Sequence, residues 1–281
     1  MKLFIIYTII IIILIIISII HLKTSVSKDK SKLFLYWEGN NKPPYIDLCI
    51  ESIYKHCSKS FDIIFLDDTT IYNYLPEVKN LNFNKLKIAQ KVDYYRIALL
   101  NKYGGVYMDT DILVLKDPIE ITNQLNKYDF VGFGCTGNVC KYGYGKPSNW
   151  ILCSKKNTIL MKNILNNYLN KLNEINNNNR EIDYHEFGKY IIWEELEKLD
   201  KTGYKYFHYP NLYDGTRDIS GHWVTMDRLF STEKINYDLP NDLLFIILYN
   251  SDSTEKYKKM NRNEILNSDT NIGNYFRKSL L

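Results

Sequence analysis

KLKIAQKVDYYRIALLNKYGGVYMDTDILVLKDP, residues 85–118, is the stretch of this sequence that decides the fold. Its first half predicts a long helix, because side chains that suit a buried face recur at three- and four-residue steps. The residues on that face are Ile88, Ala89, Val92, Tyr95, Arg96, Leu99 and Leu100. Asp93 and Arg96 lie one turn apart in such a helix, so a carboxylate and a guanidinium project side by side from a mostly apolar segment. On an exposed surface the same ion pair contributes little to stability.

Gly104 and Gly105 are expected to end this helix, because glycine readily adopts the left-handed conformation of a helix C-cap. A short strand is expected to follow, and Asp109 and Asp111 then come at the two-residue period that points both carboxylates the same way. Two carboxylates held so close repel each other unless a divalent cation lies between them, and hard oxygen ligands suit Mg²⁺ or Mn²⁺. An ion of this kind keeps positions open for substrate phosphates, so the pattern suits a nucleoside diphosphate.

The order D-x-x-R, a helix-length gap and then G-G-x-Y-x-D-x-D resembles the sugar-binding region of glycosyltransferases that contain a DXD motif. The pattern is most similar to family 32 glycosyltransferases, capsular polysaccharide synthesis proteins and the large clostridial glucosylating toxins. The resemblance implies an α/β fold of the GT-A type, which is a Rossmann-like nucleotide-sugar-binding fold with a mixed central sheet flanked by helices.

The resemblance also implies roles for individual residues. Asp109 and Asp111 would hold Mn²⁺ (or Mg²⁺) together with the donor diphosphate, and with Arg96 they form the predicted catalytic set. Asp93 and Arg96 would bind hydroxyls of the donor sugar, and Tyr107 would line the donor site. Many capsular-type relatives vary the second acidic position, whereas this chain keeps both aspartates. That retention favours a metal-dependent enzyme.

The segment before this stretch predicts the opening of a doubly wound nucleotide-binding sheet. Residues 33–37 and 61–66 have the composition of buried strands, and residues 45–57 between them form an amphipathic helical pattern. Trp37 ends the first strand in a W-x-G setting. In the resembling families such an aromatic residue stacks on the nucleotide base, and the alternative for Trp37 is a place in the core. The likeness covers residues 33–118.

Further candidate site residues lie downstream. Asn149 stands before a predicted strand, where relatives carry an asparagine that contacts the donor. The loop GTRDISGHW, residues 215–223, resembles the C-terminal lid of these transferases. By that likeness His222 completes the metal ligands and Trp223 covers the sugar, while Arg217 offers a cation to the diphosphate. His185 and Glu186 form a weaker candidate for acid/base chemistry.

Composition limits the domain count and the class of partner. A chain of 281 residues with 45% hydrophobic content suits one catalytic domain, predicted over residues 33–281. The net charge of +4 comes from scattered lysines and gives no case for nucleic-acid binding. The five cysteines include no C-x-x-C pair, which argues against a zinc knuckle. Cys135 and Cys140 are either a disulfide, if the compartment is oxidising, or free thiols.

The N-terminus predicts a membrane anchor. Residues 3–20 form an Ile-rich run long enough to span a bilayer, so residues 1–22 are interpreted as a transmembrane helix and residues 23–32 as a stalk. A cleaved signal peptide is the alternative. The expected localisation is a single-pass protein of a Golgi- or ER-like or other internal membrane. The lysines after the run favour a cytosolic domain, whereas similar anchored glycosyltransferases are lumenal, so the topology stays open.

The function predicted from the sequence is that of a hexosyltransferase. The enzyme would transfer a sugar from a UDP- or GDP-linked donor to a glycan, lipid or protein acceptor, with Mn²⁺ and with retention of anomeric configuration. Two alternatives stay open, namely a membrane-tethered sugar-binding protein without turnover and a hydrolase of nucleotide sugars. The sequence specifies neither the donor nor the acceptor.

Overall fold

The computed structural model describes residues 30–134, 146–178, 180–210, 215–237 and 243–281. All of them except Lys30 belong to one compact unit, Ser31–Leu281. In this part of the chain no helix is both long and apolar enough to cross a bilayer. The predicted anchor over residues 1–22, most of the stalk, and Cys135 and Cys140 lie outside the described residues.

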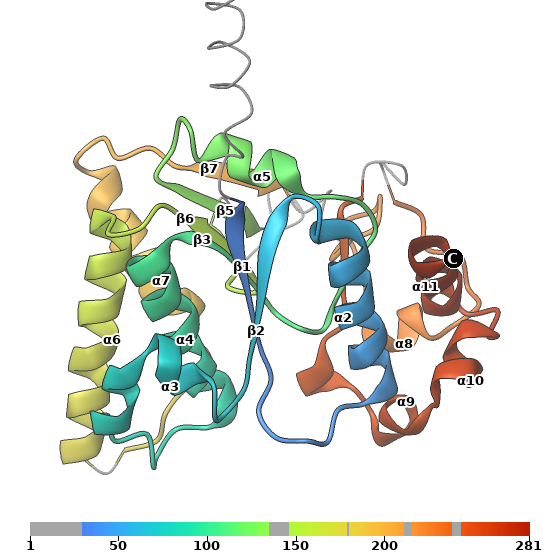
Figure 1. The fold of residues 1–281 in the computed structure, drawn as a ribbon, viewed down its shortest axis with the longest axis horizontal. Helices are drawn as coiled ribbons and strands as arrows, with labels where there is room; N and C mark the ends of the chain where they lie inside the picture. Colours follow the sequence, from blue (N-terminus) through green and yellow to red (C-terminus); the bar gives the residue numbers. More distant parts are fainter. Residues whose placement is uncertain (1–29, 135–145, 179, 211–214, 238–242) are drawn as a thin grey trace, which may run out of the picture. The chain divides into compact units, whose positions relative to one another are not determined.

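The described strands form a six-stranded sheet in the order β2-β1-β3-β6-β5-β7 and a separate pair, β4-β8. Figure 1 shows this sheet between two groups of helices. The strands are β1 Ser31–Tyr36, β2 Phe61–Leu66, β3 Gly105–Met108, β4 Ile112–Val114, β5 Phe130–Gly134, β6 Ile151–Ser154, β7 Phe207–Pro210 and β8 Phe245–Ile247. The α-helices are α2 Pro44–Cys57, α3 Ile71–Tyr74, α4 Ile88–Tyr103, α5 Ile119–Gln124, α6 Ile159–Asn177, α7 Lys189–Asp200, α8 Met226–Leu229, α9 Glu255–Lys259, α10 Arg262–Leu266 and α11 Asn271–Leu280. Two 3₁₀ helices are η1 Pro76–Asn80 and η3 Asn250–Asp252.

The opening β1-α2-β2 unit confirms the predicted strand, helix and strand. β1 pairs in parallel with β2 and with β3, so the carboxyl ends of these strands meet at one edge of the sheet. β3 pairs antiparallel with β6, β6 pairs antiparallel with β5, and β5 pairs in parallel with β7. The sheet is therefore mixed, as the Rossmann-like α/β prediction requires.

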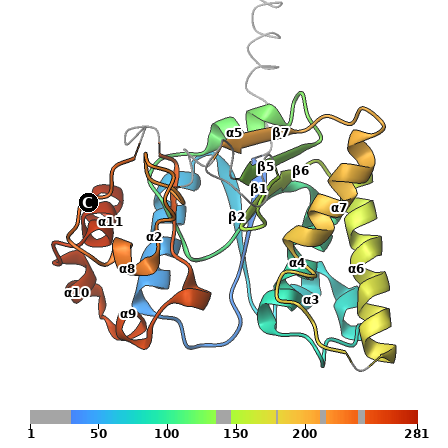
Figure 2. The ribbon, with the colours of Figure 1, turned by 180° about the vertical axis from the view of Figure 1, so that it is seen from behind.

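Side-chain alternation along the strands divides the core into two layers. Phe34 of β1 and Tyr107 of β3 pack with α4, α6 and α7 on one face of the sheet. Leu33, Val106 and Met108 point to the opposite face, where they pack with α2, α5, β4 and β8. A third cluster joins α2 to α8–α11. These helices lie together, on the right in Figure 1 and on the left in Figure 2. The period-two pattern thus gives the inner strands β1 and β3 two buried faces, whereas β2 at the edge of the sheet is partly exposed.

The two glycines between α4 and β3 permit the chain reversal that brings β3 beside β1. Gly104 and Gly105 have φ values of +68° and +103°, which side chains rarely adopt. A Cβ atom on Gly105 would also lie 2.3 Å from the carbonyl oxygen of Lys32 in β1. Glycine is required here both for the turn and for close strand pairing.

Two details of the key stretch differ from the prediction. Asp109 and Asp111 do not lie on a strand, because β3 ends at Met108 and the chain turns before β4 begins at Ile112. The predicted buried face of α4 is also only partly correct. Ile88 is 42% exposed, and the first turns of the helix border a cavity, whereas the second half is buried nearly all round.

Candidate active site

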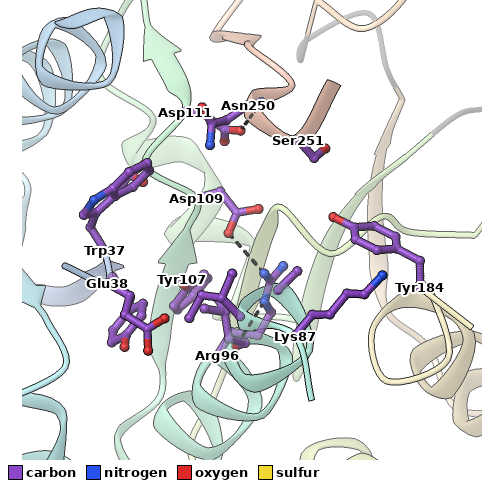
Figure 3. Close-up of a pocket in the computed structure, with 15 residues that line it drawn as sticks. Trp37, Glu38, Lys87, Arg96, Tyr107, Asp109, Asp111, Tyr184, Asn250 and Ser251 are labelled. Atoms are coloured by element: carbon purple, nitrogen blue, oxygen red, sulfur yellow. Dashed lines mark hydrogen bonds and ion pairs between the residues drawn. The ribbon is translucent and has the colours of Figure 1, made fainter. Parts of the chain in front are cut away.

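A cavity of about 460 Å³ opens where β1 and β3 end, next to the first turns of α4. Figure 3 shows the side chains that surround it. The lining residues are Tyr36, Trp37, Glu38, Lys87, Ile88, Ala89, Val92, Arg96, Tyr107, Asp109, Thr110, Asp111, Tyr184, Asn250 and Ser251. The carboxyl edge of parallel strands is where ligands bind in open α/β sheets. We call this space the donor pocket, after the role that the sequence resemblance predicts for its residues.

Arg96 is the buried cation of the donor pocket. Its side chain is 6% exposed, and its Nη2 atom lies 3.2 Å from a carboxylate oxygen of Asp109. Its Nε atom lies 3.5 Å from Asp93, as expected for positions one helical turn apart. The guanidinium also packs 5.1 Å from the centre of the Tyr107 ring. Burial opposes its charge, but the carboxylates of Asp109 and Asp93 outweigh that effect, so the pKa of Arg96 lies above its usual range.

The two aspartates of the DXD motif are held from different sides. The backbone N–H of Asp109 donates to the Trp150 carbonyl at 2.8 Å, and the side chain of Asp109 faces Arg96. The Asp111 carboxylate instead accepts from the backbone N–H of Asn250 at 3.0 Å, and the Asp111 carbonyl accepts from Leu248 at 2.8 Å. Figure 3 shows the Asp111 contact at the start of η3. Strands β4 and β8, which pair side by side, fix both loops.

The charges in the donor pocket are unbalanced. Burial, together with the neighbouring Asp109 carboxylate, raises the pKa of Asp111 to about 7. Burial also raises the pKa of Asp109, although Arg96 opposes that shift. Arg96 must serve Asp93 as well, so its one guanidinium is shared by three buried carboxylates, those of Asp93, Asp109 and Asp111. A divalent cation bound by Asp109 and Asp111 would remove this excess negative charge, and carboxylate oxygens are suitable ligands for Mn²⁺ or Mg²⁺.

Asp93 and Asn149 lie behind Arg96 and do not line the donor pocket. The Asn149 side-chain amide donates to Asp93 at 2.8 Å, and the Asn149 carbonyl accepts from Nη1 of Arg96. Burial raises the pKa of Asp93 to about 7, against the opposing effects of Arg96 and Asn149. Both residues were predicted to contact the donor directly. In the structure they instead contact Arg96 from inside the protein.

Gly188, at the start of α7, fits closely against this buried pair. A Cβ atom on Gly188 would lie 2.4 Å from the Asn149 side-chain nitrogen and 2.8 Å from an Asp93 oxygen. The close approach allows α7 to pack over α4 and the Arg96 network. No sequence motif marked this position.

Two aromatic residues of the donor pocket carry buried polar groups without a partner. The Trp37 indole N–H and the Tyr107 hydroxyl have no hydrogen-bond partner among the described residues. Buried polar groups normally have partners. Both side chains line the cavity as predicted.

The loop of residues 215–223 was predicted to close over the site, but its candidate residues lie outside the donor pocket. The Trp223 ring packs 4.7 Å from Tyr249, and the Arg217 guanidinium lies 4.6 Å from the Trp223 ring centre. Neither Trp223 nor Arg217 lines the donor pocket. Tyr249 directly precedes Asn250, whose N–H donates to Asp111. Trp223 therefore packs against a residue next to the site, and its contact with the sugar stays a prediction.

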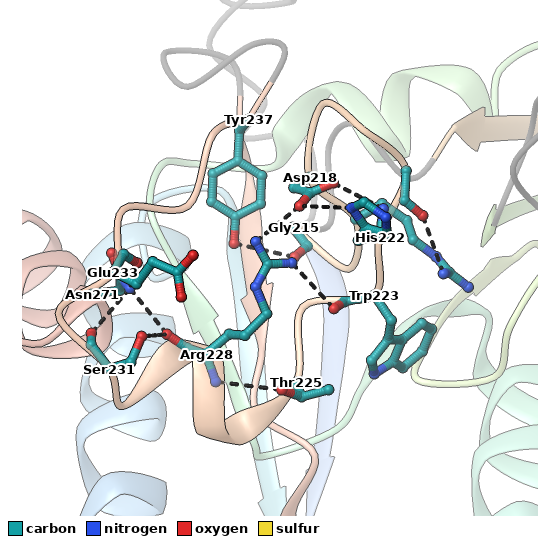
Figure 4. A network of polar contacts seen from close by, with 12 residues as sticks. Gly215, Asp218, His222, Trp223, Thr225, Arg228, Ser231, Glu233, Tyr237 and Asn271 are labelled. Atoms are coloured by element: carbon teal, nitrogen blue, oxygen red, sulfur yellow. Dashed lines mark hydrogen bonds and ion pairs between the residues drawn. The ribbon is translucent and has the colours of Figure 1, made fainter.

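His222 contacts Asp218 and not the two motif aspartates that it was predicted to join. Its ring is 77% exposed and lies 3.7 Å from Asp218, which also accepts from the His222 N–H and pairs with Arg228 at 2.8 Å. Figure 4 shows this network in the turn before α8. In the described part of the chain, no group of three or more His, Cys, Asp or Glu side chains is arranged to hold a metal. The structure does not bring His222 to Asp109 and Asp111, because Asp218 and Arg228 hold its turn elsewhere.

The weak acid/base candidate is also placed outside the donor pocket. Glu186 forms an ion pair with Arg180, and hydrogen bonds from Arg180 lower the Glu186 pKa. A carboxyl group with a lowered pKa is a poor proton donor near neutral pH. The structure gives no support for acid/base chemistry at the His185 and Glu186 pair.

Several lining residues were not found from the sequence. Lys87 and Glu38 lie close to recognised motifs but carry no special pattern, and Tyr184, Asn250 and Ser251 are far from them in the chain. Asn250 and Ser251 come shortly after the predicted late strand. Their place near the end of a strand was the sequence signal that could have marked them as site residues.

Comparisons with known proteins agree on a broad class. Residues 15–216 match the model of a family described as capsular polysaccharide synthesis protein. The chain is similar to lactosylceramide 4-alpha-galactosyltransferase of Mus musculus, with 37% identity over 59 residues, which are 21% of this chain and 16% of that protein. It is also similar to the uncharacterized glycosyltransferase L373 of Acanthamoeba polyphaga mimivirus, with 30% identity over 139 residues, which are 46% of this chain and 51% of that protein. The chain thus spans about half or less of the curated relatives that it matches.

A solved structure, the bifunctional glycosyltransferase WbbM in its apo form, aligns with 91% of this chain and 50% of its own. The TM-score is 0.48 and the sequence identity is 11%. A likeness of that strength supports no inference about activity or substrate.

Proposed function

The chain belongs to the capsular polysaccharide synthesis protein family, and from that premise we propose that it is a glycosyltransferase with a GT-A type catalytic domain. It would transfer a sugar from a nucleoside-diphosphate donor, UDP- or GDP-linked, to a hydroxyl group of a glycan, lipid or protein. The donor pocket is the proposed active site, and Mn²⁺ or Mg²⁺ is the proposed cofactor.

One observation carries this proposal. Asp109, Asp111 and Arg96 border the same cavity as Trp37, although Trp37 is more than fifty residues away in the sequence. The cavity thus combines an anionic pair suited to a cation, a buried guanidinium and an aromatic ring with a free indole N–H. A nucleotide sugar has the complementary parts, which are a diphosphate, sugar hydroxyls and a planar base.

Each residue has a physical role in the proposed reaction. Asp109 and Asp111 bind the cation, which when bound offsets the negative charge that develops on the departing diphosphate. Arg96 is fixed by Asp93 and Asn149, so its guanidinium can orient an oxygen of the donor without rearrangement. Trp37 offers an aromatic face for the base. We also propose retention of anomeric configuration, with attack from the face that the diphosphate leaves, which needs no separate protein base.

The donor is proposed to be a hexose derivative. One similar protein is named a 4-alpha-galactosyltransferase, which supports a hexose without specifying the sugar for this chain. The proposal keeps residues 1–22 as the membrane anchor, and fractionation of cells that express the full-length protein tests that part.

A donor screen tests the enzyme proposal. The full-length protein is incubated with UDP- and GDP-sugars, with Mn²⁺ or with a chelator, and release of the nucleoside diphosphate is followed. Asp111→Ala is the site variant, and Asp269→Ala, an exposed aspartate near the C-terminus, is the matched control. We expect release from one donor that is lost with the chelator and in Asp111→Ala but kept in Asp269→Ala.

The rival functions give different results in the same screen. A sugar-binding protein without turnover would bind one donor and release nothing. A hydrolase would release free sugar at the same rate with or without an acceptor. Absence of both binding and release for every donor would contradict the proposed function.

A further inference from the structure

A second cavity, of about 580 Å³, lies beside the donor pocket. Lys42, from the loop before α2, and Lys258 and Lys259, from α9, contribute to its lining. Trp37 and Asn250 line both this space and the donor pocket, so the two cavities share a wall. We call the second space the basic cavity.

The lysines of the basic cavity are only weakly neutralised by the protein. Glu255 lies 3.8 Å from Lys258 and 4.0 Å from Lys259, and no other lining residue carries a negative charge. Lys42 lies 3.7 Å from Asp47, which is 59% exposed and does not line the cavity. Pairs this long and this exposed contribute little. Three ammonium groups thus face one carboxylate inside the cavity.

Two of these lysine side chains are largely covered by the protein. The side chains of Lys42 and Lys258 are 27% and 31% exposed, whereas Lys259 is 78% exposed. Charges of one sign in a hollow surface attract oppositely charged ligands more strongly than the same charges on a flat surface. The basic cavity therefore has the electrostatics of an anion site.

The shared wall places that anion site next to the proposed chemistry. The Asn250 N–H donates to the Asp111 carboxylate, and the Asn250 side-chain oxygen accepts from the Tyr45 hydroxyl at 2.5 Å. Asn250 is thus fixed between the two cavities. A molecule in the basic cavity would be separated from the donor pocket by the width of one residue. An acceptor must lie this close to the donor pocket for its hydroxyl to reach the sugar.

We propose that the basic cavity binds a negatively charged group of the acceptor, either a carboxylate of an acidic sugar or a phosphate. This inference rests on the proposed function, because it assigns the donor's diphosphate to the donor pocket and leaves the second anion site for the other substrate. A neutral acceptor would leave the excess positive charge of Lys42, Lys258 and Lys259 uncompensated.

Paired ligands that differ in one charged group test the proposal. Binding of p-nitrophenyl β-glucuronide is compared with that of p-nitrophenyl β-glucoside, and binding of glucose 6-phosphate with that of glucose, by calorimetry on the full-length protein. The first pair reports a preference for carboxylate and the second a preference for phosphate. We expect at least one anionic ligand to bind about tenfold more tightly than its neutral partner, and the ratio to fall as NaCl is added.

A triple variant assigns the preference to the basic cavity. Lys42→Gln, Lys258→Gln and Lys259→Gln together are expected to bring the binding ratio close to one. The control combines Lys55→Gln, Lys59→Gln and Lys205→Gln, which removes the same net charge at exposed lysines outside the cavity. The control should keep the tenfold ratio. A ratio near one in the unaltered protein, or an unchanged ratio in the cavity variant, would overturn the proposal.

Donor turnover separates this inference from the proposed function. The cavity variant should release diphosphate from the donor with an unchanged KM, because its lysines do not line the donor pocket. A raised donor KM would instead assign the basic cavity to the donor's diphosphate and overturn the acceptor assignment. Absence of donor turnover in the unaltered protein would contradict the proposed function, while the calorimetric ratio would still report on the basic cavity.

Discussion

Two of the walls of the donor pocket differ in origin. One wall comes from a single continuous stretch, residues 87–111, which supplies Lys87, Arg96, Tyr107 and both motif aspartates. We call it the motif wall. The other comes from residues 249–251, where Asn250 donates a hydrogen bond to Asp111 and Tyr249 packs against Trp223. We call it the C-terminal wall.

The two walls differ in what they supply: the motif wall provides the charged groups, and the C-terminal wall holds one of them in place. The motif wall carries the charges, and its ion pairs join groups within 16 residues of one another. The C-terminal wall contributes a backbone N–H and aromatic packing, and its contact with Asp111 joins residues 139 positions apart in the sequence. Substitutions in the motif wall should therefore abolish function or stability, and substitutions behind the C-terminal wall should tune it.

The largest expected effect is on turnover in the motif wall. Asp111→Ala should lower kcat/KM for the donor by about 10³-fold, because it removes one of the two proposed cation ligands. Steady-state diphosphate release measures the change, with Asp269→Ala as the control. A loss below about tenfold would place the cation, or the chemistry, elsewhere.

Arg96→Ala tests how much the ion pairs of the motif wall contribute to the stability of the folded protein. The variant leaves the carboxylates of Asp93 and Asp109 without their cation, so the free energy of unfolding should fall by about 3–5 kcal/mol. Urea unfolding measures it, and Arg96→Lys should keep part of the stability because the charge remains. Equal stability of Arg96→Ala and the unaltered protein would show that the buried network contributes nothing to folding.

Asp93→Asn tests the same network through pH. The folded pKa of Asp93 is about 7 and its ordinary value is 3.8, so folding takes up a proton between these values. Stability from this group is fully present below about pH 4 and is lost as pH rises through 7. On going from pH 5 to pH 8 the unaltered protein should lose about 1–3 kcal/mol more than Asp93→Asn. Thermal or urea unfolding at the two pH values gives the answer, and parallel curves would refute the assignment.

The smallest effect is expected behind the C-terminal wall. Trp223→Ala should lower kcat/KM about tenfold, because loss of the ring contact with Tyr249 loosens the backbone that donates to Asp111. The Mn²⁺ concentration for half-maximal activity should rise as well. Trp223→Phe keeps an aromatic face and should stay within a few-fold of the unaltered protein. If Trp223→Ala instead raises only the donor KM, Trp223 contacts the sugar directly.

The same division explains what could be predicted from the sequence. The β1-α2-β2 opening, α4 and β3 follow from local periodicity and from the two glycines, and the structure confirms them. In the motif wall, Arg96, Tyr107, Asp109 and Asp111 were found because their spacing is fixed by one helix and one strand end, whereas Lys87 was not found. Trp37 was found because it ends a recognisable strand.

Other features could not be read from local patterns. α8, α9 and α10 have four or five residues each, too few for a periodic signal, and they pack against α2 from the opposite end of the chain. The positions of His222 and Trp223 depend on the Asp218–Arg228 ion pair and on Tyr249, which are tertiary contacts. The burial of Asp93 and Asn149 behind Arg96 depends on the approach of Gly188.

One measurement tests the central claim that the two motif aspartates make the donor pocket a cation-dependent nucleotide site. Calorimetry on the full-length protein compares the binding of UDP and GDP with and without Mn²⁺, for the unaltered chain and for the double variant Asp109→Asn, Asp111→Asn. The account predicts that one nucleotide binds with Mn²⁺, binds much more weakly without it, and does not bind to the double variant. Equally tight binding without the cation, or undiminished binding to the double variant, would contradict it.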